Sequence, residues 1–223
     1  MSGWIEFSPS NVVPSPPEFV YRYLPVKEAA EAMELGLVRL STLHQIRTAQ
    51  SARADPGDGT VTYLVKDAVW LDSGLKSSEA GALERRGFYF PPMSSMRHCA
   101  VREVHQNSYV LCTALASCDD ARMRRVFGEY RVRIRHPGKF ADLIARELSS
   151  RFGAVDRAQG LVDYSGRNKA LDQLSDIPPA FVGHPGNVSE CEWRMVWSPT
   201  SLSAEMEPLE LNIPRLSRFC KID

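Results

Sequence analysis

Two glutamates one residue apart form the most informative chemical pattern in this sequence. Glu190 and Glu192 lie in segment 188–197, which otherwise resembles a β-strand. Because side chains alternate across a strand, the two glutamates should share one face with Arg194, about 7 Å apart, while Cys191 faces the core. Such paired acids suit general-base work or the stabilisation of a cationic transition state. The alternative is a solvent-facing strand edge whose charges keep the protein soluble.

Length and composition favour one globular domain. The chain has 223 residues, 43% of them hydrophobic, which is enough to bury a substantial core. We expect residues 1–17, which end in a proline-rich run, to form an extended lead-in and residues 18–223 to form a single domain. Lys and Arg total 27, as do Asp and Glu, so the overall charge does not draw the protein to nucleic acid or an anionic membrane.

The apolar runs and the cysteines indicate the cellular compartment, and the spacing of the cysteines and histidines argues against a metal site. The longest apolar runs are too short to cross a bilayer, and the first residues lack the pattern of a signal peptide, so we expect a cytoplasmic protein. The five scattered cysteines fit reduced thiols. His98, Cys99, His105, Cys112 and Cys118 contain no zinc-type pair, so we expect no metal site.

Hydrophobic periodicity predicts an α+β protein. We expect strands at 18–24, 37–42, 60–71, 108–116, 129–135, 188–197 and 209–213, and helices at 26–36, 120–127, 140–152 and 167–174. A turn-rich loop should fill 47–60, and a short helical stretch should lie within 75–103. The elements do not alternate regularly, which separates the chain from parallel α/β folds.

Three motifs occur in an order and spacing that resemble a known family. A strand with an arginine precedes a helix that ends in Gly-Leu, a buried strand follows, and a Glu-x-Glu strand runs into proline. The matching residues are Val20-Tyr21-Arg22-Tyr23 with Gly36-Leu37, Leu111-Cys112-Thr113-Ala114 with Pro137-Gly138, and Glu190-Cys191-Glu192 with Ser198-Pro199-Thr200. Across about residues 18–213 the chain resembles the ADP-ribosyltransferase fold in its Arg-Ser-Glu branch. It also resembles a widespread bacterial family of uncharacterised domains with a Glu-x-Glu-x-Arg strand.

The resemblance implies a split mixed sheet with flanking helices that binds NAD. Glu192 would stabilise the positive charge that builds on the ribose as nicotinamide leaves, and Glu190 would orient or deprotonate the acceptor. Arg22 would face the pyrophosphate or the adenosine ribose. The cofactor-contacting set is completed by Tyr23, Ser41 and Thr113. The family's Ser-Thr-Ser is Cys-Thr-Ala here, so Thr113, or Ser117 further on, would replace the missing hydroxyl.

The resemblance therefore implies an NAD-dependent ADP-ribosyltransferase that modifies a macromolecular acceptor or hydrolyses NAD, of the bacterial toxin, effector or phage-defence type. A non-catalytic binding module of the same fold is the first alternative. The second is a nucleic-acid-binding protein that uses the basic run Arg122–Arg135, although these arginines equally suit a solvated surface. Trp193 and Trp197 alternate with the glutamates and are expected in the core.

Overall fold

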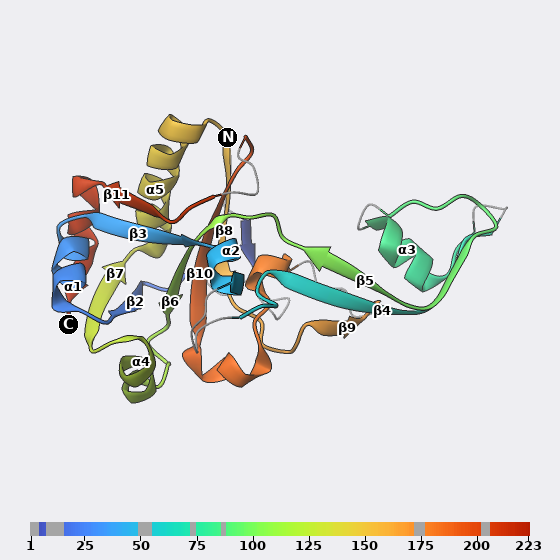
Figure 1. Cartoon of the computed structure of the whole chain (residues 1–223), viewed down its shortest axis with the longest axis horizontal. Coiled ribbons are helices and arrows are strands. Elements are labelled where there is room, and N and C mark those ends of the chain that lie inside the picture. The colour runs from blue at the N-terminus through green and yellow to red at the C-terminus, as the bar shows by residue number, and fades with distance from the viewer. Residues whose placement is uncertain are drawn as a thin grey trace.

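The computed structural model of the chain describes residues 5–7, 16–48, 55–71, 75–85, 88–171, 177–201 and 206–223. Within these ranges the protein is α+β, with two β-sheets and flanking helices (Figure 1). The strands of the larger sheet are β1 (Ile5–Phe7), β2 (Phe19–Leu24), β3 (Leu37–Thr42), β6 (Tyr109–Ala114), β7 (Tyr130–Arg135), β8 (Val155–Leu161), β10 (Glu192–Pro199), β11 (Leu209–Asn212) and β12 (Cys220–Ile222). The smaller sheet contains β4 (Thr60–Val69), β5 (Ser95–Val104) and β9 (Asn168–Ala170).

Helices cover both sheets. The α-helices are α1 (Lys27–Glu34), α2 (Leu43–Thr48), α3 (Ser78–Arg85), α4 (Asp120–Phe127) and α5 (Pro137–Phe152). Short 3-10 helices are η2 (Pro179–Phe181), η3 (Pro185–Glu190) and η4 (Pro214–Arg218). Among the helices of the described ranges, none has the length and hydrophobicity needed to cross a membrane.

The larger sheet divides at β6. Its main path runs β1-β8-β10-β6-β2-β7-β12, while β3 also pairs with β6 and carries β11 on its far side. Strand β2 meets β6 only at the pair Tyr21 and Ala114, whereas β3 meets β6 at Val110 and Tyr109. The two branches therefore leave opposite ends of β6, and the backbone around Cys112 lies between them.

Each face of the larger sheet has its own core. On one face, α1, α5 and η4 pack over Trp193, Met195 and Trp197, all at most 2% exposed. The indole Nε1 of Trp197 donates a hydrogen bond to the carbonyl of Ala141 on α5. On the other face, Val110 and Val196 join the core of the smaller sheet. The helix α4 covers another part of this face through Met123, which packs on Tyr23 and Ala114.

The smaller sheet extends away from the body. Figure 1 shows β4 and β5 side by side, with α3 near their far end. Strand β9 pairs in parallel with β4 near its start. At this start β4 lies against the body, because Val61 and Tyr63 share a core with Val196 of β10. The turn that precedes β4 is thereby fixed beside the larger sheet.

Most of the expected elements are confirmed. Strands β2, β3, β6, β7 and β11 and helices α1, α4 and α5 agree with the predicted positions to within a few residues. The Asp119 side chain caps α4 by accepting from the backbone amide of Arg122. Trp193 and Trp197 lie in the core, as the alternation of β10 predicts.

Other expectations were wrong. A helix was predicted at 167–174, but residues 168–170 form the strand β9. The reason is that this backbone pairs with β4 and that Lys169 donates to the buried carboxylate of Asp163. Residues 172–174 lie outside the described ranges. The predicted loop 47–60 overlaps α2, which ends at Thr48, although residues 56–59 do form a turn. The segment predicted as an extended lead-in contains β1, whose parallel pairing with β8 was not predicted. The sequence analysis did not predict β8 or β12.

We predict that the two glycines that end α4 and α5 differ in their tolerance of alanine. At Gly128 (φ +134°) a Cβ would lie 2.2 Å from the Leu24 carbonyl oxygen, whereas at Gly153 (φ +80°) it would meet no described atom within 4 Å. Gly153→Ala should lower the free energy of unfolding by about 1–2 kcal/mol through backbone strain alone. Gly128→Ala should lose about 3 kcal/mol or more in the same urea titration. Equal losses would contradict the close approach of α4 to the end of β2.

Candidate functional site

The start of β10 corrects the predicted arrangement of the two glutamates. Glu190 is the last residue of η3, and Cys191 adopts a left-handed conformation with φ +44° before the strand begins at Glu192. The glutamates are therefore not neighbours on one strand face. Cys191 does not face the core; it is partly exposed, and its Sγ contacts the carbonyl of Val188. The 3-10 helix η3 begins at a proline, and the left-handed Cys191 separates it from β10. The periodicity of the sequence does not reveal that the predicted strand is interrupted in this way.

Glu192 lies in a buried ion network with Arg194. The guanidinium donates from Nε to Oε1 at 2.7 Å and from Nη2 to Oε2 at 3.0 Å, a two-pronged contact that occupies both carboxylate oxygens. Nη1 of the same arginine donates to Oδ1 of Asp58 at 2.8 Å and to the carbonyl of Ala180. All three charged residues are at most 7% exposed. The network joins β10 to the turn before β4.

Burial and pairing act in opposite directions on this network. Burial lowers the pKa of Arg194, but the carboxylates of Asp58 and Glu192 outweigh it and raise that pKa well above its usual value. Burial raises the pKa of the Asp58 carboxyl, with Arg194 opposing and Glu192 adding to the shift. Arg194 therefore remains a cation between two acids. The Asp-Pro-Gly-Asp-Gly segment has the sequence of a simple turn, which does not indicate this role of Asp58.

Glu190 is the more accessible of the two acids. Burial, and then the negative charge of Glu192, raise the pKa of Glu190 to about 7, while Arg122 on α4 and Arg194 act in the opposite direction. A carboxyl group with this pKa exchanges a proton near neutral pH, which suits a general base. Arg122 therefore acts electrostatically at this end of β10.

The middle motif presents Cys112 to the acid face and turns Thr113 away from it. Glu192 pairs with Ala114 and Arg194 with Cys112, and paired residues share a face. Thr113 pairs with Trp193 on the opposite face, where its hydroxyl donates to the Trp193 carbonyl. Burial, and then the charge of Glu192, raise the pKa of the Cys112 thiol well above its usual value, so it remains protonated. The predicted replacement of the missing hydroxyl by Thr113 is therefore wrong for the Glu192 face.

Arg22 reaches the same part of β6 from the other branch of the sheet. Its Nη1 donates to the backbone carbonyl of Cys112, between the points where β2 and β3 leave β6. On the acid side, Tyr164 follows β8, and its hydroxyl lies 3.5 Å from Oε2 of Glu192. Burial, and then the charge of Glu192, raise the pKa of Tyr164, so the phenol is a proton donor. The sequence analysis did not identify Tyr164, because nothing in its local sequence indicates this contact.

The remaining predicted cofactor residues lie at different depths. Tyr23 is 5% exposed, and its hydroxyl donates to Asp120 at 2.7 Å, so its polar group is engaged within the protein. Ser41 pairs with Val110 and thus faces the same side of the sheet as Glu192. Val110 is four residues from Ala114 along β6, a separation of about 13 Å. Ser41 therefore lies away from Glu192. Tyr21 pairs with Ala114, so Arg22 belongs to the opposite face of β2 from Glu192 and reaches the branch point through its guanidinium.

The basic run is largely paired with acids. Arg131, Arg133 and Arg135 alternate with the buried Val132 and Ile134, so the three arginines share one strand face as predicted. Their partners and those of Arg124 are acidic: Asp120 binds Arg124 and Arg131, Asp223 binds Arg131 and Arg133, and Glu18 lies 3.9 Å from Arg135. This pairing reduces the excess positive charge that a nucleic-acid surface would present.

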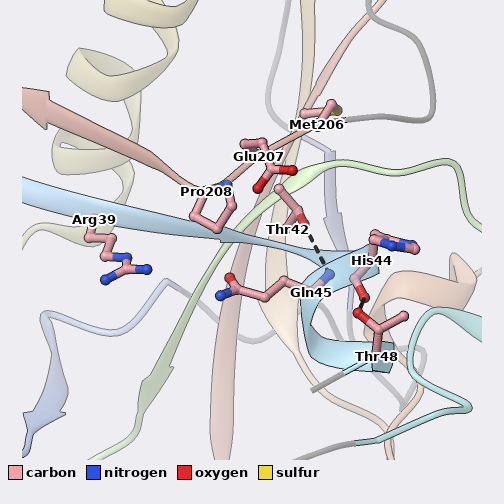
Figure 2. A pocket seen from close by; sticks show the side chains of 8 residues that line it. All are labelled: Arg39, Thr42, His44, Gln45, Thr48, Met206, Glu207 and Pro208. Carbon is pink, nitrogen blue, oxygen red and sulfur yellow. Dashed lines mark hydrogen bonds between the residues drawn. The ribbon is translucent and has the colours of Figure 1, made fainter. Parts of the chain in front are cut away.

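A cavity of about 560 Å³ opens beside β3 and α2, and its lining does not include either glutamate. Figure 2 shows Arg39 and Gln45 reaching toward each other on one side of it, while His44 points the other way. Thr42 accepts from the amide of Gln45 and holds the first turn of α2. Within the described ranges, no group of three or more metal-binding side chains comes together.

The comparisons with known proteins give no relative. No family model, curated protein or solved structure matches the chain. The chemistry of the site therefore follows from its geometry: a buried carboxylate bound by Arg194, a second carboxyl whose pKa is raised to about 7, and an arginine at the branch point of the sheet.

We predict that Arg194→Met lowers the free energy of unfolding by about 3–5 kcal/mol, because it leaves Asp58 and Glu192 buried without a counter-ion. Adding Asp58→Asn and Glu192→Gln should restore part of the loss by removing the buried charges. Arg157→Met is the matched control: its partner Asp142 is 34% exposed, so about 1 kcal/mol or less should be lost. Urea denaturation measures all three, and a loss no larger than the control's would refute the network's role.

The raised pKa of Glu190 predicts a pH-dependent stability. The folded protein holds a proton on Glu190 up to a pKa of about 7, whereas the unfolded chain releases it near 4.5. The contribution of Glu190 to the free energy of unfolding is fully present below pH 4.5 and is lost as the pH rises through 7. Glu190→Gln should therefore gain stability relative to the natural chain between pH 4.5 and 7.5, as measured by chemical denaturation. A difference that is the same at both pH values would contradict the shifted pKa.

Proposed function

We propose that this chain is an NAD-dependent ADP-ribosyltransferase that modifies a macromolecular acceptor, with NAD hydrolysis as the side reaction when no acceptor is bound. It would act in the bacterial cytoplasm as a toxin, effector or phage-defence component. The proposal rests on the order of the sequence motifs and on where the fold brings them.

One observation carries the proposal: three motifs far apart in the sequence meet at the branch point of the larger sheet. Arg22 donates to the carbonyl of Cys112, Cys112 lies opposite Arg194 across the β6–β10 pair, and Arg194 binds Glu192. Strands β2 and β3 leave β6 on either side of Cys112, and a dinucleotide would lie at this divergence with its charged groups near Arg22. The split of the sheet at β6 supports the ADP-ribosyltransferase resemblance.

The proposed chemistry assigns one role to each acid. Glu192 would oppose the positive charge that develops on the ribose when the nicotinamide bond breaks, and Tyr164 would orient the carboxylate. Glu190, with its pKa of about 7, would accept the proton of the attacking acceptor. Arg122, which acts electrostatically on Glu190, and Arg22 would contact the phosphate oxygens of NAD.

A second candidate is a binding module of the same fold without catalysis. The observation that favours it is the two-pronged contact of Arg194 with Glu192, which occupies both carboxylate oxygens and offsets the charge that the reaction would need. The loss of a hydroxyl at Cys112 favours it as well. Such a module would bind NAD or a related dinucleotide and leave it intact.

We predict that substitutions of Glu192 and Glu190 affect NAD hydrolysis and ADP-ribose transfer differently. Glu192→Gln should lower both nicotinamide release and ADP-ribose transfer by about 100-fold or more, because the charge opposing the cation is lost. Glu190→Gln should spare much of the hydrolysis but lose transfer, since breaking the nicotinamide bond needs no acceptor base. Labelled NAD with cell lysate, treated or not with nuclease or protease, measures both reactions and the nature of the acceptor.

Thr113→Val is the matched control, because its hydroxyl lies on the opposite face of β6 and its loss should leave both reactions unchanged. Melting temperatures of all variants separate chemistry from unfolding. NAD binding by calorimetry with no nicotinamide release would refute the enzyme and favour the binding module. Wild-type activity in Glu192→Gln would show that the network is structural.

A further inference from the structure

A second hollow, of about 490 Å³, lies between α5 and η4. Four cationic side chains line it: Lys139 and Arg146 from α5, and Arg215 and Arg218 from η4. The helix α5 packs on the face of the larger sheet that carries Trp193, whereas Glu192 belongs to the other face. This hollow is therefore separated by the sheet from the site proposed for NAD.

Helical spacing brings the four cations together. Lys139 and Arg146 are seven residues, or about two turns, apart and lie on one side of α5, while Ile144 points into the core. Arg215 and Arg218 are three residues apart, which is one turn of a 3-10 helix, and the buried Leu216 anchors η4. Core packing of both helices thus places the four exposed cationic residues around one hollow.

Among the described residues that line this hollow, four cations face a single acid. Among the described residues, no ion pair involves Lys139, Arg146, Arg215 or Arg218. The acid in the lining, Asp142, accepts from Arg157 at 2.6 Å. The chain as a whole is neutral, so the excess is local. Cations that line one hollow repel one another, and an anion bound between them relieves this repulsion.

We propose that the hollow binds a small ligand with two or more linked phosphates, of the size of a nucleoside di- or triphosphate. Its volume falls within the range of small-molecule sites, and arginine donors match phosphate oxygens. Phe219 and Leu143 add apolar surface at the edge of the hollow for a base or sugar. The cations surround a single space, whereas a nucleic-acid surface presents them along a stripe.

Titration calorimetry with inorganic tripolyphosphate and with ATP, without metal and at two salt concentrations, tests the proposal. The natural chain should bind both, more weakly at high salt. The combined variant Arg146→Gln, Arg215→Gln, Arg218→Gln should bind about tenfold more weakly or worse. A matched variant that removes three exposed cations elsewhere, Lys66→Gln, Arg85→Gln, Arg102→Gln, should bind as the natural chain does.

Comparing the affinities for ATP and for tripolyphosphate shows which part of a nucleotide the hollow recognises. Tighter binding of ATP than of tripolyphosphate assigns the apolar edge to a nucleotide base, and equal binding assigns the site to the linked phosphates alone. Equal loss in both triple variants would overturn the proposal, as would binding of a single-stranded oligonucleotide without binding of either small ligand. Nicotinamide release does not enter these measurements, so failure here leaves the proposed NAD chemistry unaffected, and the reverse also holds.

Discussion

The guanidinium of Arg194 is the interaction on which the rest of the candidate site depends. It holds Glu192 on its own strand and Asp58 on the turn that starts the smaller sheet, and all three groups are shielded from water. Removing charges from water is costly, so the arrangement persists only while every partner is present. The same contact that positions the acid also fixes the smaller sheet against the larger one.

The alternation of side chains between the two faces of β6 and β10 then determines which side chains reach this network. Glu192, Arg194 and Cys112 share a face because they are paired across β6 and β10, while Thr113 and Trp193 share the other. A shift by one residue would exchange the two sets. The face that excludes Thr113 presents a protonated thiol to Glu192 where the family resemblance implied a hydroxyl.

Much of the fold was predictable from periodicity, and much of the site was not. The helix α5 and the strand β6 show strong local patterns, as does the alternation within β10. The left-handed Cys191, which separates the two glutamates, has no local signature. The contact between Arg194 and Asp58 joins residues 136 positions apart, and β9 is a strand only because β4 offers an edge. Long-range pairing overrode the local preference in these cases.

The central place of β10 has a consequence for how the protein is made. This strand lies between β6 and β8, and its first residues carry the acid network, yet both neighbours and Asp58 precede it in the chain. During synthesis, the edges of β6 and β8 that pair with β10 remain unpaired until residues 192–199 emerge from the ribosome. Because so many contacts are distant in sequence, folding should be slow, and an unfinished chain cannot carry the network. The acid network can therefore form only after the chain has been synthesised through β10.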